Sequence, residues 1–202
     1  MKNFIEELDN IKDYYRAGNP TQGLPEELFL FVSRCTPIVN VDTLAYDKEK
    51  GFLLSWRDDE YAGKGWHVPG GIVRFKEKVE DRLVKTIVSE LKCPVNFSFT
   101  GSPITVQEVF PDHETRGHFV SFLYTVTLPE DYQIDNGDLS DTDPGFLQWH
   151  KECPSNLVEC QDMYLPFIDH EFYDINTHLS PTPMPSNREQ VQQDEEDCGC
   201  GS

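Results

Sequence analysis

The residues whose types and spacing suit chemistry lie between positions 69 and 90. A Pro-Gly-Gly turn occupies residues 69–71, Glu77 follows six residues after its last glycine, and a helical segment ends close to Glu90. On that segment Thr86, Ser89 and Glu90 share one face, so the face carries a single carboxylate. Such a face suits one Mg2+ ion, completed by a backbone carbonyl, an acid from elsewhere in the chain, waters and substrate phosphates.

A mixed set of strands and helices must position these residues. The clearest helix is predicted over residues 79–92, because Leu83, Ile87 and Leu91 fall on one stripe of it. A β-hairpin precedes the Pro-Gly-Gly turn, with a polar loop leading from the hairpin to residue 66. The predicted strands are 38–46, 52–57, 72–75, 103–110, 118–128 and 146–149, and further helices are expected at about 25–35 and 163–173. This order indicates an α+β fold class.

The order of elements and motifs resembles the Nudix hydrolase family. Its signature reads Gly, five residues, Glu, seven residues, then Arg-Glu-apolar-any-Glu-Glu-any-Gly-apolar. Matching positions are Gly71, Glu77, Ile87 and Glu90, while Lys85 stands for the arginine and Cys93 fits loosely. The resemblance implies a Nudix fold, in which a mixed β-sheet is sandwiched between helices, and a hydrolase that uses Mg2+.

Loss of the other carboxylates of the signature resembles the GDP-mannose mannosyl hydrolase branch of that family. The likeness extends through residues 36–39 with Asp42, residues 52–54 with Arg57, and residues 65–71, and it covers roughly residues 30 to 150. It implies Mg2+-dependent hydrolysis of a nucleotide sugar, GDP-mannose or a related GDP-hexose. Attack at the sugar carbon would release GDP and free sugar.

The resemblance also implies a role for each matching residue. Gly70 would supply a carbonyl ligand and Glu90 a carboxylate ligand to Mg2+. The other implied roles are a diphosphate contact for Arg57, a nucleotide or sugar contact for Asp42, a place near the phosphates for Lys85, and a brace of the loop before the helix for Glu77.

Several positions depart from the branch. Its arginine after Gly-Gly is Ile72 here, although Arg74 has the same strand parity and is expected to reach the same cleft. The branch's catalytic histidine in the acidic loop has no counterpart, and its third metal ligand aligns best with Asp143. The candidate general bases are therefore Asp143, His118 and His113, and His118 is also a candidate substrate contact.

These departures leave two alternatives open. One is a Nudix diphosphatase that cleaves a P–O–P bond in another nucleoside diphosphate derivative. The other is a catalytically weak Nudix protein that binds a nucleotide sugar. Joint retention of residues 70, 71, 77, 90 and 57 favours an enzyme.

The composition limits the partners. A net charge of -19 disfavours nucleic acid polymers and anionic membrane surfaces. A small nucleotide sugar remains compatible if Mg2+ and local cations neutralise it. No signal peptide or membrane-spanning run is recognised, and six cysteines lack framework spacing, so a cytoplasmic protein with free thiols is expected.

The chain divides into three predicted parts. Residues 1–35 are an N-terminal helical extension with an amphipathic helix at 3–16, residues 36–179 are the Nudix domain, and residues 180–202 are a disordered acidic tail. Because the similar branch forms dimers through its N-terminal region, a homodimer is expected.

Overall fold

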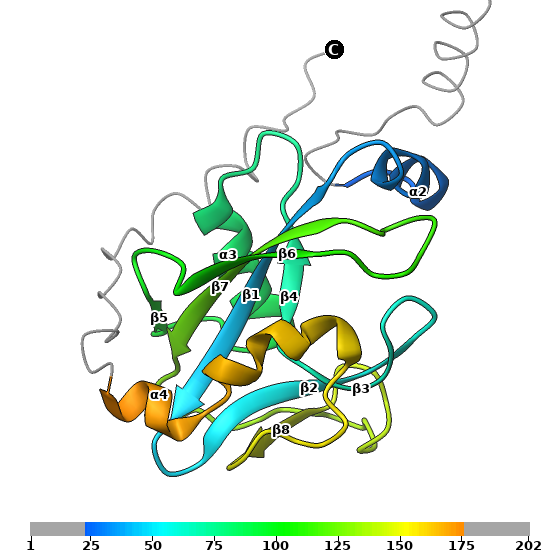
Figure 1. Ribbon diagram of the computed structural model, residues 1–202. Helices are drawn as coiled ribbons and strands as arrows, with labels where there is room; N and C mark the ends of the chain where they lie inside the picture. The colour runs from blue at the N-terminus through cyan, green and yellow to red at the C-terminus, as the bar shows by residue number, and fades with distance from the viewer. Residues whose placement is uncertain (1–22, 176–202) are drawn as a thin grey trace, which may run out of the picture.

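The computed structural model describes residues 23–175, in which a mixed sheet lies between helices (Figure 1). The expected helix at 3–16 and the acidic tail at 180–202 lie outside these residues. The helices are α2 (Glu26–Ser33), α3 (Val79–Glu90), the 3-10 helix η2 (Glu159–Phe167) and α4 (His170–Ile175). The strands are β1 (Ile38–Asp47), β2 (Gly51–Asp59), β3 (Gly63–His67), β4 (Gly70–Ile72), β5 (Ser98–Phe99), β6 (Thr105–Val109), β7 (Phe119–Thr127) and β8 (Leu147–His150). None of the helices between residues 23 and 175 has the length and apolar composition needed to cross a membrane.

The sheet is built around β1. Its strand order is β3-β2-β1-β7-β5, with β4 paired to β1, β6 to β7 and β8 to β2. β1 runs parallel to β7 and antiparallel to β2 and β4. The long strand β1 therefore carries the hairpin partner β2 towards one end and the short glycine strand β4 towards the other.

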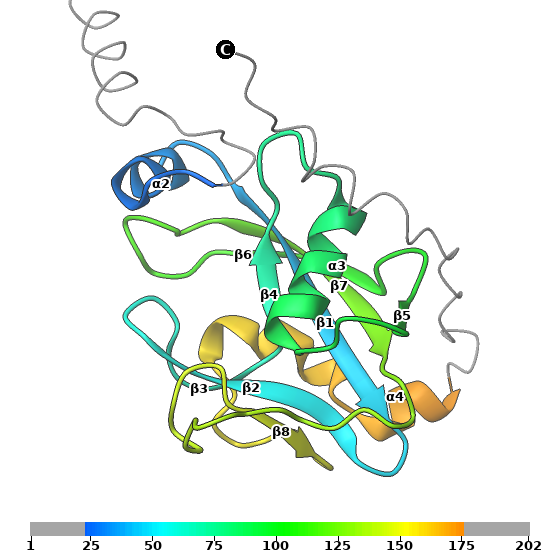
Figure 2. The same ribbon diagram turned by 180° about the vertical axis from the view of Figure 1, so that it is seen from behind.

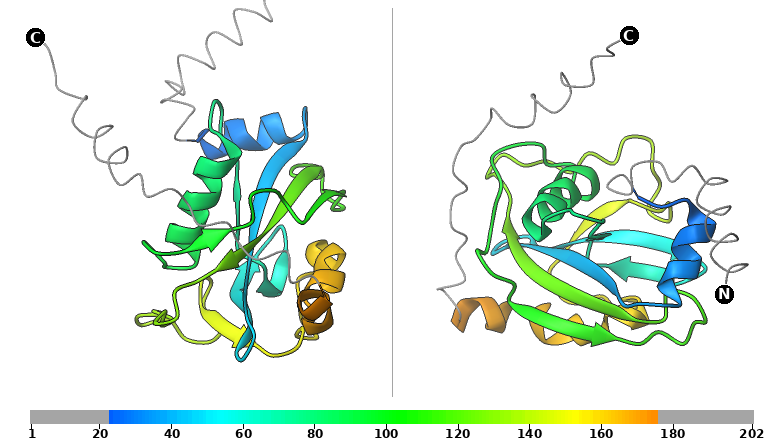
Figure 3. Two further views of the ribbon diagram at one scale, coloured as in Figure 1. Left: turned by 90° about the vertical axis from the view of Figure 1, so that its left-hand side faces the viewer. Right: turned by 90° about the horizontal axis from the view of Figure 1, so that it is seen from above.

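Helices cover both faces of the sheet. Figure 3 shows α3 on one face, and η2 with α4 on the opposite face. Residues 41–45 of β1 are all buried, as expected for a strand covered on both sides. Val41 and Ala45 pack in the cluster under α3, whereas Leu44 packs in the cluster under η2. The even-numbered residues of β1, including Asp42, thus face η2.

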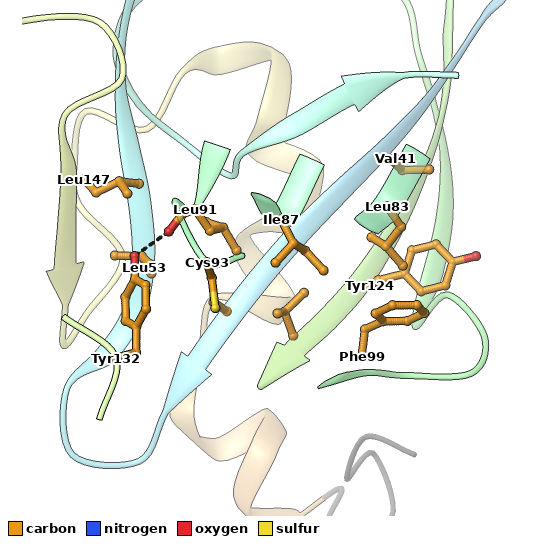
Figure 4. Close-up of a cluster of buried hydrophobic side chains, with 12 residues drawn as sticks. Val41, Leu53, Leu83, Ile87, Leu91, Cys93, Phe99, Tyr124, Tyr132 and Leu147 are labelled. Atoms are coloured by element: carbon orange, nitrogen blue, oxygen red, sulfur yellow. Dashed lines mark hydrogen bonds between the residues drawn. The ribbon is translucent and has the colours of Figure 1, made fainter. Parts of the chain in front are cut away.

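The cluster under α3 explains why the predicted helix forms there. Leu83, Ile87 and Leu91 are fully buried against the sheet (Figure 4). At the end of α3 the Tyr132 hydroxyl donates a 2.6 Å hydrogen bond to the carbonyl of Leu91. This bond ties the acidic segment after β7 to the helix terminus.

Three local predictions were wrong. The strand expected at 72–75 is β4, at residues 70–72, so both glycines pair with β1 instead of forming a turn. The loop expected before residue 66 contains β3, which pairs with β2. The helix expected at 163–173 is interrupted: η2 contains Pro166, which lacks a backbone N–H, and Ile168 leaves helical geometry with φ -90° and ψ 56°.

Three segments gather at one end of the sheet. α2, the loop between β2 and β3, and the loop between β6 and β7 project towards the same side of the molecule (Figures 1 and 2). They surround the end of β1 that pairs with β4.

Candidate functional site

A cavity of about 880 Å3 lies at this end of the sheet. Its walls come from α2, β1, β4, η2 and the β2–β3 and β6–β7 loops. Among the described residues that line it, four are arginines, Arg57, Arg74, Arg82 and Arg116, and one, Asp42, is acidic. In a chain of net charge -19 this is a local reversal of sign, and it suits an anionic ligand.

Asp42 is the buried carboxylate of the cavity. Its side chain accepts hydrogen bonds from Asn40 Nδ2 at 2.8 Å, Ser121 Oγ at 2.5 Å and the Tyr164 hydroxyl at 2.6 Å. Burial raises the pKa of Asp42 to about 6, while these hydrogen bonds hold it down. The carboxylate thus needs three polar partners in order to stay buried.

Gly70 lies directly against this carboxylate. An added Cβ at Gly70 would lie 2.0 Å from Asp42 Oδ1, so any side chain here collides. The flanking hydrogen bonds, Thr43 N to Pro69 O and Val73 N to Val39 O, fix the alternation of the β1–β4 ladder. By that alternation the Gly70 carbonyl points away from β1, towards the side of β4 where the described residues place no strand. It is a backbone oxygen available to a ligand.

The start of α3 is held by Glu77. Its carboxylate has 4% exposure and accepts hydrogen bonds from Arg74 N, from Arg82 Nε and Nη2, and from Lys85 Nζ, all at 2.8–2.9 Å. These charge-assisted bonds lower the pKa of Glu77 despite the opposing effect of burial. They fix the loop after β4 and aim Arg82 along the cavity wall.

The face of α3 towards β4 continues to Glu90. A Cβ at Gly71 would lie 2.5 Å from Thr86 Oγ1, so the helix sits against the glycine strand. Thr86 Oγ1 is buried and has no hydrogen-bond partner among the residues that the structure describes. Glu90 lies one turn further along the same face and accepts a 3.3 Å hydrogen bond from Ser89.

His67 and Arg57 occupy the β2–β3 wall. Because the Ser55 carbonyl can only accept, His67 Nδ1 carries the proton of their 2.8 Å hydrogen bond, and Nε2 is left as an acceptor. Burial, with a smaller effect of the charge of Arg57, lowers the pKa of His67 to about 4, so its ring is neutral at pH 7. Arg57 donates through Nε to Asp59.

Of the residues predicted to form the site, the structure brings Asp42, Arg57, Gly70 and Arg74 together in the cavity wall, and the candidate base His113 with them. Lys85, Glu90, Asp143 and His118 are not among its lining residues. The Asp143 carboxylate accepts 2.7 Å hydrogen bonds from Ser140 N and Oγ, which lower its pKa. His118 stacks on Phe110 at 4.5 Å, and its Nε2 lies 3.4 Å from Glu108 Oε1.

Sequence reasoning missed other lining residues. Arg116 and Tyr61 come from loops, where no periodicity singles out a residue, and Arg82 lies outside the apolar stripe by which its helix was predicted. Tyr164 supports the site from 122 positions beyond Asp42. The only signal for Arg116 in the sequence is that it is a cationic residue in an otherwise acidic chain.

The oxygen donors near the cavity decide whether this region suits a metal ion. Within residues 23–175 no three His, Cys, Asp or Glu side chains are placed together to hold a metal ion. The Gly70 carbonyl and the Glu90 carboxylate remain as hard oxygen donors on adjacent elements, and the packing of Gly71 on Thr86 brings those elements together. This set fits a Mg2+ ion that shares its coordination with substrate phosphates and water.

No family model matches the chain. It is 29% identical over 120 residues to the low-salt glycan biosynthesis protein Agl8 of Haloferax volcanii, which covers 57% of this chain and 75% of that protein. A MutT Nudix hydrolase of Burkholderia pseudomallei superposes with a TM-score of 0.50 at 18% identity, over 65% of this chain and 97% of that one. A possible asymmetric diadenosine tetraphosphate hydrolase of Jonesia denitrificans gives a TM-score of 0.47 at 23% identity, over 74% and 99% of the two chains. The superposition on the Burkholderia pseudomallei protein shows that the chain has the fold of the Nudix hydrolases.

Proposed function

We propose that this protein is a Nudix hydrolase that acts on a nucleotide sugar, with GDP-mannose or a related GDP-hexose as the candidate substrate. The observation that carries the proposal is the cavity itself, lined by four arginines and one buried carboxylate in a chain of charge -19. Such a cavity suits a small ligand with a diphosphate at one position and hydroxyl or amide donors at another.

Different residues of the cavity would bind different parts of the ligand. Arg57 and Arg74 would bind the diphosphate, because guanidinium groups match phosphate geometry. Asp42, as an acceptor, would bind a hydroxyl of the sugar or an N–H of the base. The likeness at 29% identity to a protein named for glycan biosynthesis supports a sugar-containing substrate.

The Gly70 carbonyl and the Glu90 carboxylate would hold Mg2+, with Asp143 as the proposed third ligand. When bound, Mg2+ would neutralise charge on the diphosphate leaving group. Lys85 lies next to this helix face but is held by Glu77, so its contribution would be a positive field near the phosphates.

The bond that breaks depends on the general base. Attack at the sugar carbon requires a group that takes a proton from water, for which Asp143, His118 and His113 are the candidates. Attack at phosphorus is the alternative, and it is supported by Ile72 at the position of the branch's arginine and by the absence of the branch's catalytic histidine from the acidic loop. The products separate the two reactions.

The test is incubation of the full-length protein with GDP-mannose, GDP-glucose or GDP-fucose in Mg2+. We expect GDP and free hexose from wild type and loss of turnover in Glu90→Gln. Glu80→Gln, which removes the same charge from an exposed position in the first turn of α3, is the matched control and should keep full activity. GMP with hexose phosphate would replace carbon attack by phosphorus attack, and no turnover with any GDP-hexose would refute the proposed substrate class.

A further inference from the structure

Arg116 stands out on the cavity wall because its guanidinium group lies over two aromatic rings. Its guanidinium carbon lies 4.3 Å from the ring centre of Tyr61 and 5.8 Å from that of Phe29. Both distances are within cation–π range. Rings that pack on a guanidinium leave its N–H edge free to donate.

The surrounding loops fix this arrangement. The Arg116 backbone N–H donates to Ser33 Oγ at 3.0 Å, which ties it to α2. His113 Nε2 donates to the carbonyl of Tyr61 at 3.0 Å, which ties the β6–β7 loop to the β2–β3 loop. A Cβ at Gly117 would lie 2.4 Å from the His113 carbonyl, so the loop closes tightly behind the arginine.

Among the described residues no ion pair neutralises Arg116, and the charge of Asp59 acts on it only from a greater distance. Within residues 23–175 no carboxylate lies within ion-pair distance of it, and its buried Nε has no hydrogen-bond partner. Burial, and secondly the nearby charge of Arg57, lower the pKa of Arg116. Arg57 already shares the carboxylate of Asp59. The guanidinium groups of Arg57 and Arg116 therefore face one cavity, and of these two only Arg57 has an ion-pair partner among the described residues.

We propose that Arg116 is a second phosphate-binding residue, which acts together with Arg57 on the diphosphate of the ligand, and that Tyr61 positions it. This rests on the proposed function for the identity of the ligand but not for the bond that is cleaved. A fixed, unpaired donor edge lowers the cost of ordering a side chain when the anion binds. Joint phosphate binding also explains why the acidic chain keeps the charges of Arg57 and Arg116 close together.

The test measures binding of GDP and of inorganic pyrophosphate by calorimetry on the full-length protein in a chelating buffer. Because the lost hydrogen bonds are charge-assisted, Arg116→Gln should lower the binding affinity for both ligands by about ten- to a hundredfold. It should also reduce the salt dependence of binding. Arg34→Gln is the matched control, because Arg34 is exposed, pairs with Glu114 on the same loop and lies outside the cavity lining. It should leave both affinities unchanged.

Variants of Tyr61 test the positioning role. Tyr61→Phe keeps the ring and should retain both affinities, whereas Tyr61→Leu should lose part of them with its unfolding temperature little changed.

Three results would each overturn the inference. Arg116→Gln could bind both ligands with unchanged affinity, it could lose affinity for GDP but not for pyrophosphate, or the wild type could bind neither ligand. Hydrolysis of GDP-mannose that does not depend on Arg116 overturns the inference alone. Arg116-dependent pyrophosphate binding without hydrolysis of any GDP-hexose refutes only the proposed function.

Discussion

The Tyr164 hydroxyl donates a 2.6 Å hydrogen bond to the Asp42 carboxylate, so the 3-10 helix η2 is fastened directly to the strand that floors the cavity. Both residues are buried, and Tyr164 is fully so. The carboxylate proposed to contact the ligand is thus held by a residue 122 positions further along the chain.

Tyr164→Phe should lower the free energy of unfolding by about 1.5–3 kcal/mol at pH 8, because the lost bond has a charged acceptor. Tyr132→Phe is the matched control, since Tyr132 donates at the same 2.6 Å distance to the neutral carbonyl of Leu91 and should cost about 0.5–1.5 kcal/mol. Urea unfolding of both variants gives the comparison. Equal losses would mean that the charge of Asp42 contributes nothing to the bond.

Gly70→Ala should destabilise the protein by more than about 2 kcal/mol, because its Cβ would collide with the Asp42 carboxylate. Gly101→Ala should change stability by no more than about 0.5 kcal/mol, since a Cβ there meets nothing within 4 Å. Thermal unfolding followed by circular dichroism measures both. A tolerated Gly70→Ala would show that Asp42 has room to move.

Glu77→Gln should lower stability by roughly 3–5 kcal/mol, because it leaves the largely buried Arg82 without its charged partner. It should also reduce activity, since Arg82 lines the cavity. Glu114→Gln breaks the exposed pair with Arg34 and should cost at most about 1 kcal/mol. If denaturant titrations gave similar values for both, Glu77 would not act as a brace.

The pH dependence of stability should contain two opposing contributions. The pKa of His67 is lowered in the folded state to about 4, so the unfolded chain binds more protons and stability rises with pH between about 4 and 6.5. The pKa of Asp42 is raised to about 6, so the folded chain binds more protons and stability falls between about 4 and 6. Each contribution is on the order of 3 kcal/mol, and they largely cancel in wild type.

Single substitutions should separate these contributions. Relative to wild type, His67→Asn should make stability fall more steeply as pH rises from 4 to 6, and Asp42→Asn should make it rise more steeply. Urea unfolding at several pH values gives the slopes. Slopes parallel to that of wild type in both variants would disprove the two shifts.

Elements with a strong local pattern could be predicted from the sequence. The hairpin of β1 and β2 and the helix α3 follow from alternation and from a 3.6-residue stripe, both of which are carried by consecutive residues. β4 was misplaced because its glycines resemble a turn until β1 pairs with them. β5 was missed because two residues carry no period.

By itself the sequence determined the fold class and the apolar stripe of α3, with Glu77 before the helix and Glu90 at its end. It also determined the acidic net charge, against which four arginines in one cavity stand out. Only the tertiary structure decided which residues share that cavity. Asp42 meets Tyr164, and Arg116 meets Tyr61 and Phe29, through contacts between segments far apart along the chain. Such contacts depend on how the sheet, α2 and the loops pack, and local residue patterns do not record that packing.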